Sequence, residues 1–193
     1  MIDYIKGNID KITPACIVLE TTGIGYFINI SLTTFSALEN KNDVKIFVHE
    51  VIREDAHQLF GFATDGEREI FRHLISVTGV GANTARMMLS SLSPAEVERA
   101  IVGSDVNILK GVKGIGLKTA QRIIVDLKEK LSKHTETAEI FTSSDNTNRE
   151  EALSALVMLG FAKSAVSKIL DKIVREERSL TVEEMIKRAL KNL

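Results

Sequence analysis

The sequence contains few of the residue types that mark extracellular, membrane or β-sandwich proteins. Among 193 residues there are one cysteine, two prolines and no tryptophan. The single cysteine, Cys16, cannot form an internal disulfide, which excludes a disulfide-stabilised scaffold and favours a reducing compartment. No apolar run reaches the roughly 18 residues needed to cross a bilayer, and Asp3 and Lys6 would interrupt the apolar core of a signal peptide. We therefore expect a cytoplasmic, mostly helical protein with no membrane partner.

Charge is almost balanced over the whole chain but is unevenly placed along it. The formal net charge of −1 argues at first against a nucleic-acid partner, because such binding largely neutralises phosphates with Lys and Arg. Residues 1–64 carry 5 basic and 8 acidic side chains. Residues 65–131 carry 10 basic and 8 acidic side chains, and residues 132–193 carry 10 of each kind. Residues 108–131 hold two acidic side chains and six basic ones, Lys110, Lys113, Lys118, Arg122, Lys128 and Lys130. One short segment is therefore distinctly basic.

Residues 1–64 have the composition of a small β-barrel. Runs rich in β-branched and aromatic residues predict strands within residues 16–20, 26–31, 45–52 and 58–62. A polar segment at 53–57 separates two of these runs, as expected for a hairpin loop that faces solvent. About five short strands in such a segment favour a barrel, since closure removes exposed sheet edges.

From residue 65 the hydrophobic period becomes helical. Ile70, Leu74 and Val77 share one helical face. Ser93, followed by proline and then by Glu96, predicts a helix start with a capping box. The helical spacing of apolar residues continues up to residue 131. We therefore expect about five helices in residues 65–131, the last of which is the longest.

A polar segment separates this helical region from the C-terminal one. Residues 132–149 contain three apolar residues and show no periodicity, which predicts a flexible linker with a random-coil span of about 20–25 Å. Three helices are expected after it, and Thr181 with Glu184 predicts a capping box at the start of the last one.

The most informative feature is a repeat inside the first helical region. The segment VTGVGANTAR at 77–86 recurs 35 residues later as VKGIGLKTAQ at 112–121. Glycines permit φ > 0 and a close backbone approach, and the apolar residue between them anchors the turn to the core. Amides at the start of the following helix can then face a phosphate oxygen. Such turns hold the nucleic-acid backbone without reading base edges, so they predict binding that does not depend on base sequence.

The second copy also resembles the phosphate loop of ATPases, but three features disfavour this alternative. That loop requires Lys directly after its last glycine, whereas Leu117 separates Gly116 from Lys118. It also needs a strand before Gly111 and an acidic residue on a separate strand, but Asp126 falls in the same expected helix. The four histidines have no metal-binding spacing. We therefore expect no catalytic residue, no metal and no cofactor.

Over essentially its full length the chain resembles the RuvA family of Holliday-junction-binding subunits. The resemblance rests on the order and spacing of GIGY at 23–26, VIREDA at 51–56, LFGF at 59–62, both Gly-x-Gly turns and ALSALVMLGF at 152–161. It implies an α+β, multidomain fold with an N-terminal OB-fold β-barrel, a tandem helix-hairpin-helix domain, a flexible linker and a C-terminal three-helix, UBA-like domain. We assign these parts to residues 1–64, 65–131, 132–149 and 150–193, respectively.

The resemblance implies a non-enzymatic subunit that binds four-way (Holliday) DNA junctions. It implies a homotetramer, or an octamer of two tetramers, that holds the junction open and recruits the RuvB motor ATPase for branch migration. Recombination, DNA repair and the SOS response would be its setting, and the RuvC resolvase would be a further partner. The alternative is a general module for single-stranded nucleic acid or a nuclease accessory, although 5% aromatic residues provide few surfaces for base stacking.

The resemblance also assigns residues to roles. Glu54 and Asp55 correspond to an acidic pin near the junction centre, where carboxylates repel phosphates. The implied DNA contacts lie in the two turns and comprise Gly79, Val80, Gly81, Asn83, Thr84, Lys113, Gly114, Ile115, Gly116, Lys118, Thr119 and Arg122. The implied motor contacts are Leu156, Leu159, Phe161 and Leu190. For Leu156 and Leu190, packing in the three-helix core is an equal alternative.

Both turns depart from the family's common pattern. Ala82 and Asn83 stand where many relatives have Pro-Lys, and Leu117 stands where lysine is frequent. Each departure removes one cation, while the backbone amides, Lys118 and Arg122 remain. We therefore expect the phosphate contacts to persist with less positive charge.

Overall fold

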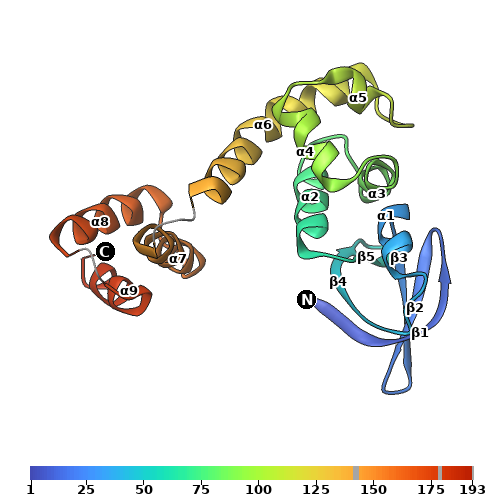
Figure 1. The fold of residues 1–193 in the computed structure, drawn as a ribbon, viewed down its shortest axis with the longest axis horizontal. Helices are drawn as coiled ribbons and strands as arrows, with labels where there is room; N and C mark the ends of the chain where they lie inside the picture. The colour runs from blue at the N-terminus through green and yellow to red at the C-terminus, as the bar shows by residue number, and fades with distance from the viewer. Residues whose placement is uncertain (141–143, 178–179, 193) are drawn as a thin grey trace. The chain divides into compact units, whose positions relative to one another are not determined.

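The chain divides into two compact units, Met1–Ser132 and Lys133–Leu193, which are described separately. The computed structural model describes residues 1–140, 144–177 and 180–192 (Figure 1). A β-barrel and helices make up the first unit, and helices make up the second. None of the helices within the described ranges has an apolar stretch long enough to cross a membrane.

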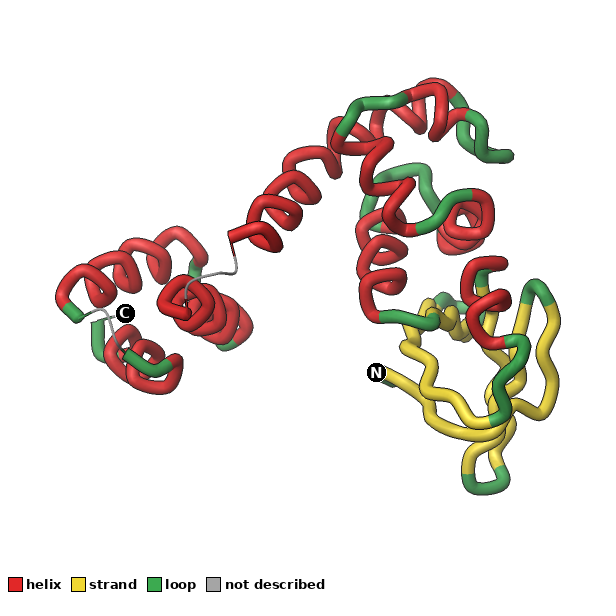
Figure 2. The backbone as a smooth tube through the Cα atoms, viewed as in Figure 1, coloured by secondary structure: helices red, strands yellow, loops and turns green. Residues whose placement is uncertain are grey.

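Five strands form a closed barrel in the order β1-β2-β3-β5-β4, which confirms the predicted architecture. Neighbouring strands are antiparallel except for β3 and β5, which run parallel. Figure 2 shows the strands in yellow, gathered in one part of the first unit. Their bounds are β1 Tyr4–Thr13, β2 Cys16–Thr21, β3 Ile24–Ile30, β4 Asp43–Ile52 and β5 His57–Phe62.

Alternating side chains fill the barrel interior. In β2, Ile17 and Leu19 are fully buried, whereas the intervening Val18 is half-buried and the following Glu20 is exposed. Helix α1 (Leu32–Leu38) follows β3 and adds Leu38 to the same core. The barrel therefore combines strand alternation with one short helix between β3 and β4.

Five helices follow the barrel, as the helical period predicts. They are α2 Asp65–Ile75, α3 Ala82–Ser91, α4 Pro94–Val102, α5 Val106–Lys110 and α6 Leu117–Ile140. The capping box at α4 is confirmed, since the Ser93 hydroxyl accepts from the Glu96 amide while the Glu96 carboxylate accepts from the Ser93 amide. Phe71 of α2 packs against Phe60 and Phe62 of β5, with ring centroids 5.3 and 4.8 Å apart. The helical core thus continues into the last barrel strand.

A buried carboxylate joins α2 to the barrel. Glu67 is 2% exposed and accepts hydrogen bonds from the Ser31 hydroxyl at 2.6 Å, the Thr34 hydroxyl at 2.8 Å and the Ala63 amide at 3.2 Å. Because each bond satisfies part of its charge, the carboxylate can remain in an otherwise apolar interface.

A buried guanidinium makes a second connection between α2 and the barrel. Arg68 donates to the Asp3 carboxylate at 2.6 Å and to the Asp65 carboxylate at 2.5 Å. Burial lowers the pKa of the Arg68 guanidinium, but the hydrogen bonds to these two carboxylates outweigh it and raise the pKa overall. Arg68 therefore stays charged and holds α2 against β1.

The second unit is a bundle of α7 (Ser144–Met158), α8 (Lys163–Glu176) and α9 (Val182–Leu190). Its core contains Ala152, Leu156, Val166, Leu170 and Met185. The predicted capping box at α9 is confirmed, with Thr181 and Glu184 as its members.

The segment expected as a flexible linker differs from that expectation. Helix α6 continues through residues 132–140, and α7 begins at residue 144. Residues 141–143 lie outside the described residues. A random-coil span therefore does not describe 132–140 or 144–149, where local helix formation prevails over the weak hydrophobic pattern.

Candidate nucleic-acid interface

The two Gly-x-Gly turns, residues 79–81 and 114–116, have the same backbone hydrogen bonds. In the first, the Val80 amide donates to the Val77 carbonyl at 3.0 Å, and the Ala85 amide donates to the Gly81 carbonyl at 2.9 Å. The same pattern occurs 35 residues later, where the Ile115 amide donates to the Val112 carbonyl at 3.0 Å and the Ala120 amide donates to the Gly116 carbonyl at 2.9 Å. The repeat in sequence is therefore a repeat in structure.

The first glycine of each turn adopts a conformation that other residues rarely adopt. Gly79 has φ +94° and Gly114 has φ +93°, in the region that costs an L-residue about 1–2 kcal/mol. Val80 and Ile115, which follow them, are 5% and 4% exposed. The prediction of a positive-φ turn anchored by an apolar residue is thus confirmed at both copies.

The second glycine of each turn is not required by the fold. Gly81 has φ −85° and ψ 166°, an extended conformation open to any residue. A Cβ atom added at Gly81 or at Gly116 would meet no heavy atom of the chain within 4 Å. The missing side chains leave free space beside the backbone, which is what the close approach of a ligand's phosphate group needs.

Helix α3 also begins without a side-chain cap. Side chains accept from the first amides of α1, α2, α4, α5 and α9, whereas α3 and α8 have no such bond; at α3 the preceding residue, Gly81, has no side chain to supply one. Gly116 occupies the same place before α6. Amides left without a cap at a helix start are donors available to an anion.

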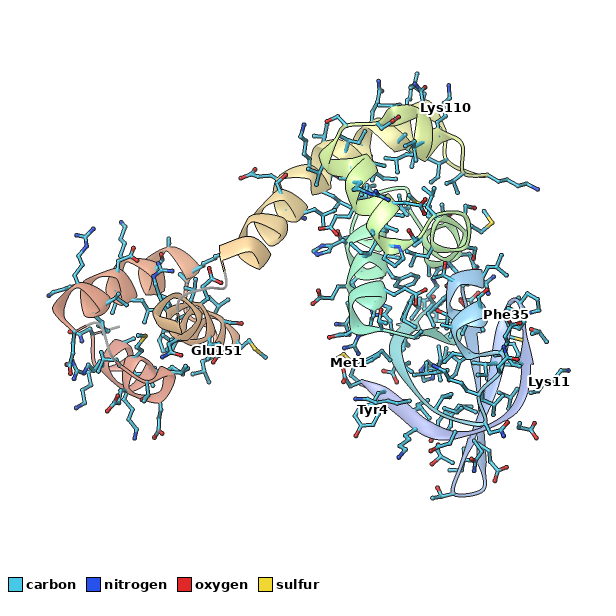
Figure 3. The ribbon with its side chains drawn as sticks, in the orientation of Figure 1. Met1, Tyr4, Lys11, Phe35, Lys110 and Glu151 are labelled. Atoms are coloured by element: carbon cyan, nitrogen blue, oxygen red, sulfur yellow. The ribbon has the colours of Figure 1, made fainter. Side chains whose placement is uncertain are left out.

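The predicted side-chain contacts divide into exposed and buried groups. Asn83, Lys113, Lys118 and Arg122 are exposed, and Thr84 and Thr119 are half-buried. Lys110, labelled in Figure 3, ends α5 just before the second turn and is exposed as well. The side chains of Val80 and Ile115 lie in the core, so only their backbone atoms can contact DNA.

The acidic residues Glu54 and Asp55 lie at the tip of the β4–β5 hairpin. The Arg53 amide donates to the Ala56 carbonyl at 2.8 Å, which closes the two-residue tip between them. Both acidic side chains are exposed, and Ile52 beside them is 69% exposed. The hairpin therefore presents two carboxylates to solvent, as the sequence predicts for this loop.

The structure contradicts the ATPase alternative. The residues before Gly111 form the helix α5 rather than a strand, and Asp126 lies on α6, the same helix as Lys118. A phosphate loop requires the strand–loop–helix arrangement. No three His, Cys, Asp or Glu side chains cluster as metal ligands among the described residues.

One of the four expected motor-contact residues belongs to the core. Leu156 is fully buried, so packing, and not surface contact, is its role in the three-helix unit. Leu159, Phe161 and Leu190 are 64%, 36% and 44% exposed. Phe161 follows the end of α7. Its amide donates to the Leu156 carbonyl, and this bond turns the chain away from the helix axis.

The exposed apolar surface of this unit also includes residues that the sequence analysis did not single out. Met158 is 86% exposed and Val157 is 39% exposed. A signal was present, since Ala152 and Leu156 are spaced for an inward face, which leaves 157 and 158 on the outward one. We call Val157, Met158, Leu159, Phe161 and Leu190 the exposed apolar residues of the second unit.

Comparisons with known proteins match this arrangement of parts. Residues 1–61 match the family model described as RuvA N terminal domain, residues 71–129 match SAM-like Helix-hairpin-helix tandem, and residues 147–193 match RuvA, C-terminal domain. The chain is 52% identical to a protein of Christiangramia forsetii, with all of both chains covered. The chain belongs to the RuvA family.

Other RuvA proteins show similar identity over the full length of both chains. The protein of Parabacteroides distasonis is 53% identical and that of Flavobacterium psychrophilum is 48% identical. All three relatives carry the description Holliday junction branch migration complex subunit RuvA. Family membership therefore confirms the resemblance drawn from the motifs.

Proposed function

We propose that this chain binds four-way DNA junctions and supports their branch migration in recombination and repair. The observation that carries the proposal is the free space at Gly81 and Gly116, each beside the start of a helix in a duplicated turn. The fold does not require glycine at position 81 or at position 116. A ligand backbone that must come close to the protein backbone at each turn explains why both positions are glycine. The names of the relatives support a Holliday junction as that ligand.

The turns would bind phosphates and leave the bases unread. Backbone amides of α3 and α6 donate to phosphate oxygens, and Lys113, Lys118 and Arg122 add positive charge. Since none of these contacts requires a base edge, affinity does not depend on base sequence. Duplex arms are thereby held at their backbones.

The acidic tip would supply the preference for shape. Glu54 and Asp55 repel phosphates by about 1 kcal/mol per pair at 4 Å in water, and by more where solvent is restricted. A continuous duplex lying across them would suffer this repulsion. An open junction, whose strands part at the crossover, would avoid it.

Four copies of the chain would match the four arms of the junction. We propose a homotetramer whose copies each present two Gly-x-Gly turns to one region of the junction. A second tetramer on the opposite DNA face would complete an octamer. Light scattering of the complex with junction DNA distinguishes these two assemblies by mass.

The exposed apolar residues of the second unit would bind the RuvB motor, which supplies ATP hydrolysis. Leu159, Phe161 and Leu190 are retained from the sequence prediction, and Met158 joins them because it is 86% exposed. We keep residues 1–64, 65–131 and 150–193 as the proposed domains, with 132–149 between the DNA-binding part and the motor-binding part. The RuvC resolvase would act on the same complex.

Salt dependence tests the phosphate contacts. If each of four subunits neutralises two phosphates, the logarithm of the affinity for junction DNA should fall with the logarithm of salt concentration at a slope of about −7. Fluorescence anisotropy with a labelled junction measures this slope. A slope near zero would contradict the proposal, and tighter binding to single strands would support a general single-strand module instead.

A further inference from the structure

A chain of side-chain hydrogen bonds connects the first Gly-x-Gly turn to the acidic hairpin. Arg86 lies on α3, one helical turn after the helix begins at Ala82. Its Nη1 donates to the Ala15 carbonyl and to the Asn29 side-chain oxygen Oδ1, both at 3.1 Å. The Nδ2 of Asn29 then donates to the Leu59 carbonyl at 3.1 Å.

The end of this chain lies on the strand that carries the acidic tip. Leu59 belongs to β5, which begins at His57, two residues after Asp55 of the tip. In the barrel it pairs with Ile28 of β3 and with Glu50 of β4. The β3–β5 pairing covers three residue pairs, so the Asn29 side chain adds a bond to a short seam.

Arg86 is directed to the barrel. Its position just after the Thr-Ala of the repeat would suit a phosphate ligand, yet its Nη1 serves two barrel acceptors. The other end of α3 is fixed to α1, where the Thr33 hydroxyl donates to the Leu89 carbonyl at 2.6 Å and the Leu32 amide donates to the Ser90 hydroxyl at 3.1 Å. Helix α3 is thus bonded to the barrel domain at its middle, through Arg86, and near its C-terminal end.

We propose that Arg86 and Asn29 are positioning residues that fix the first Gly-x-Gly turn relative to the acidic tip, and thereby set the preference for junctions over duplex. This inference rests on the proposed function. The turn binds the phosphates of a DNA arm, and the tip repels a continuous duplex. The chain can therefore distinguish a junction from a duplex only if the turn and the tip keep a constant separation. Without Arg86, α3 loses its hydrogen bonds to Ala15 and Asn29, while the amides at its start can still bind phosphates.

The test compares Arg86→Met, Asn29→Ala and the double variant in the full-length chain. The matched control is Arg99→Met, because Arg99 is an exposed arginine of α4 whose Nε donates to the Ala95 carbonyl of its own helix at 3.3 Å. Dissociation constants are measured for a four-way junction and for linear duplex of equal length, together with the thermal midpoint. Asn29→Asp, which is nearly the same size and keeps the acceptor for Arg86, serves if the alanine variant fails to fold.

Each single variant should lower the junction-to-duplex affinity ratio about fivefold while duplex affinity stays within twofold of wild type. The double variant should resemble the singles, since both residues act in one chain of bonds. The control should keep the wild-type ratio. These results together support the positioning role.

Four outcomes would overturn it. If Arg86→Met weakens junction and duplex binding equally and reduces the salt slope while Asn29→Ala does neither, Arg86 is a direct phosphate ligand. Unchanged ratios, or additive losses in the double variant, also exclude a shared positioning role. Equal affinity of the wild-type chain for junction and duplex would instead refute the proposed function, and this inference with it.

Discussion

Gly81→Ser should raise stability and weaken DNA binding at the same time. Gly81 precedes α3 with φ −85° and ψ 166°, and Ser31 precedes α1 with nearly the same angles, φ −80° and ψ 164°. At α1, the Ser31 hydroxyl accepts from the Thr34 amide at 3.0 Å. A serine at position 81 can therefore cap α3 without a change of backbone, and its Cβ meets no atom of the chain within 4 Å.

The two effects have different sizes. Exchanging an N-terminal capping glycine for serine should raise the free energy of unfolding by roughly 0.3 kcal/mol, because the new hydroxyl satisfies one amide. The same atoms would fill the space proposed for the phosphate and occupy its donor. Loss of one hydrogen bond to a charged group costs about 1.5 kcal/mol or more, which is about tenfold in the dissociation constant.

Thermal unfolding and anisotropy with junction DNA measure both effects on one preparation. Gly79→Ala is the contrasting variant, since its φ of +94° should cost about 1–2 kcal/mol of stability. A Gly81→Ser protein that is more stable and still binds the junction as tightly as wild type would refute the phosphate role of this turn. A less stable Gly81→Ser protein would refute the capping argument.

Five further substitutions test the fold, the C-terminal surface and the pH dependence of stability. Gly7→Ala should lower the free energy of unfolding of the first unit by about 1–3 kcal/mol in denaturant unfolding, because the new Cβ would lie 2.1 Å from the Glu20 carbonyl oxygen. Gly66→Ala is the contrast: a Cβ there meets open space inside α2, so this variant should raise the free energy of unfolding by about 0.4–1 kcal/mol. Leu156→Ala should lower the free energy of unfolding by about 2–5 kcal/mol in the same measurement, because Leu156 is fully buried. Leu159→Ala should change the free energy of unfolding by less than about 0.5 kcal/mol, because Leu159 is exposed, but should weaken binding of the motor. Burial and two nearby arginines lower the pKa of His49 in the folded chain. As the pH falls below about 6.5, the imidazole is therefore protonated first in the unfolded chain, and the free energy of unfolding should decline. His49→Gln should reduce that decline, and an unchanged dependence of stability on pH would contradict this argument.

Sequence alone predicts the features that depend on local chemistry. The duplicated turns could be found because glycine at a positive φ and a buried Val80 or Ile115 leave a fixed pattern along the chain. Capping boxes at Ser93 and Thr181 were predictable for the same reason, since both partners lie within four residues.

Features that depend on distant contacts could not be predicted in the same way. Strand β1 has polar residues at many of its positions, and it is held by pairing with both β2 and β4. Leu156 lies in the last turn of α7 and Leu159 directly follows that helix, and only the packing of α8 and α9 shows which leucine is buried. The direction of Arg86 depends on acceptors 57 and 71 positions away in sequence.

Junction selectivity is tested most directly by competition binding. The full-length chain is bound to a labelled four-way junction and challenged with unlabelled junction, linear duplex or single strands of equal length. The unlabelled junction should displace the label at a much lower concentration than either competitor, whatever its base sequence. Equal displacement by linear duplex would contradict the central claim that the Gly-x-Gly turns and the acidic tip together recognise the shape of a junction.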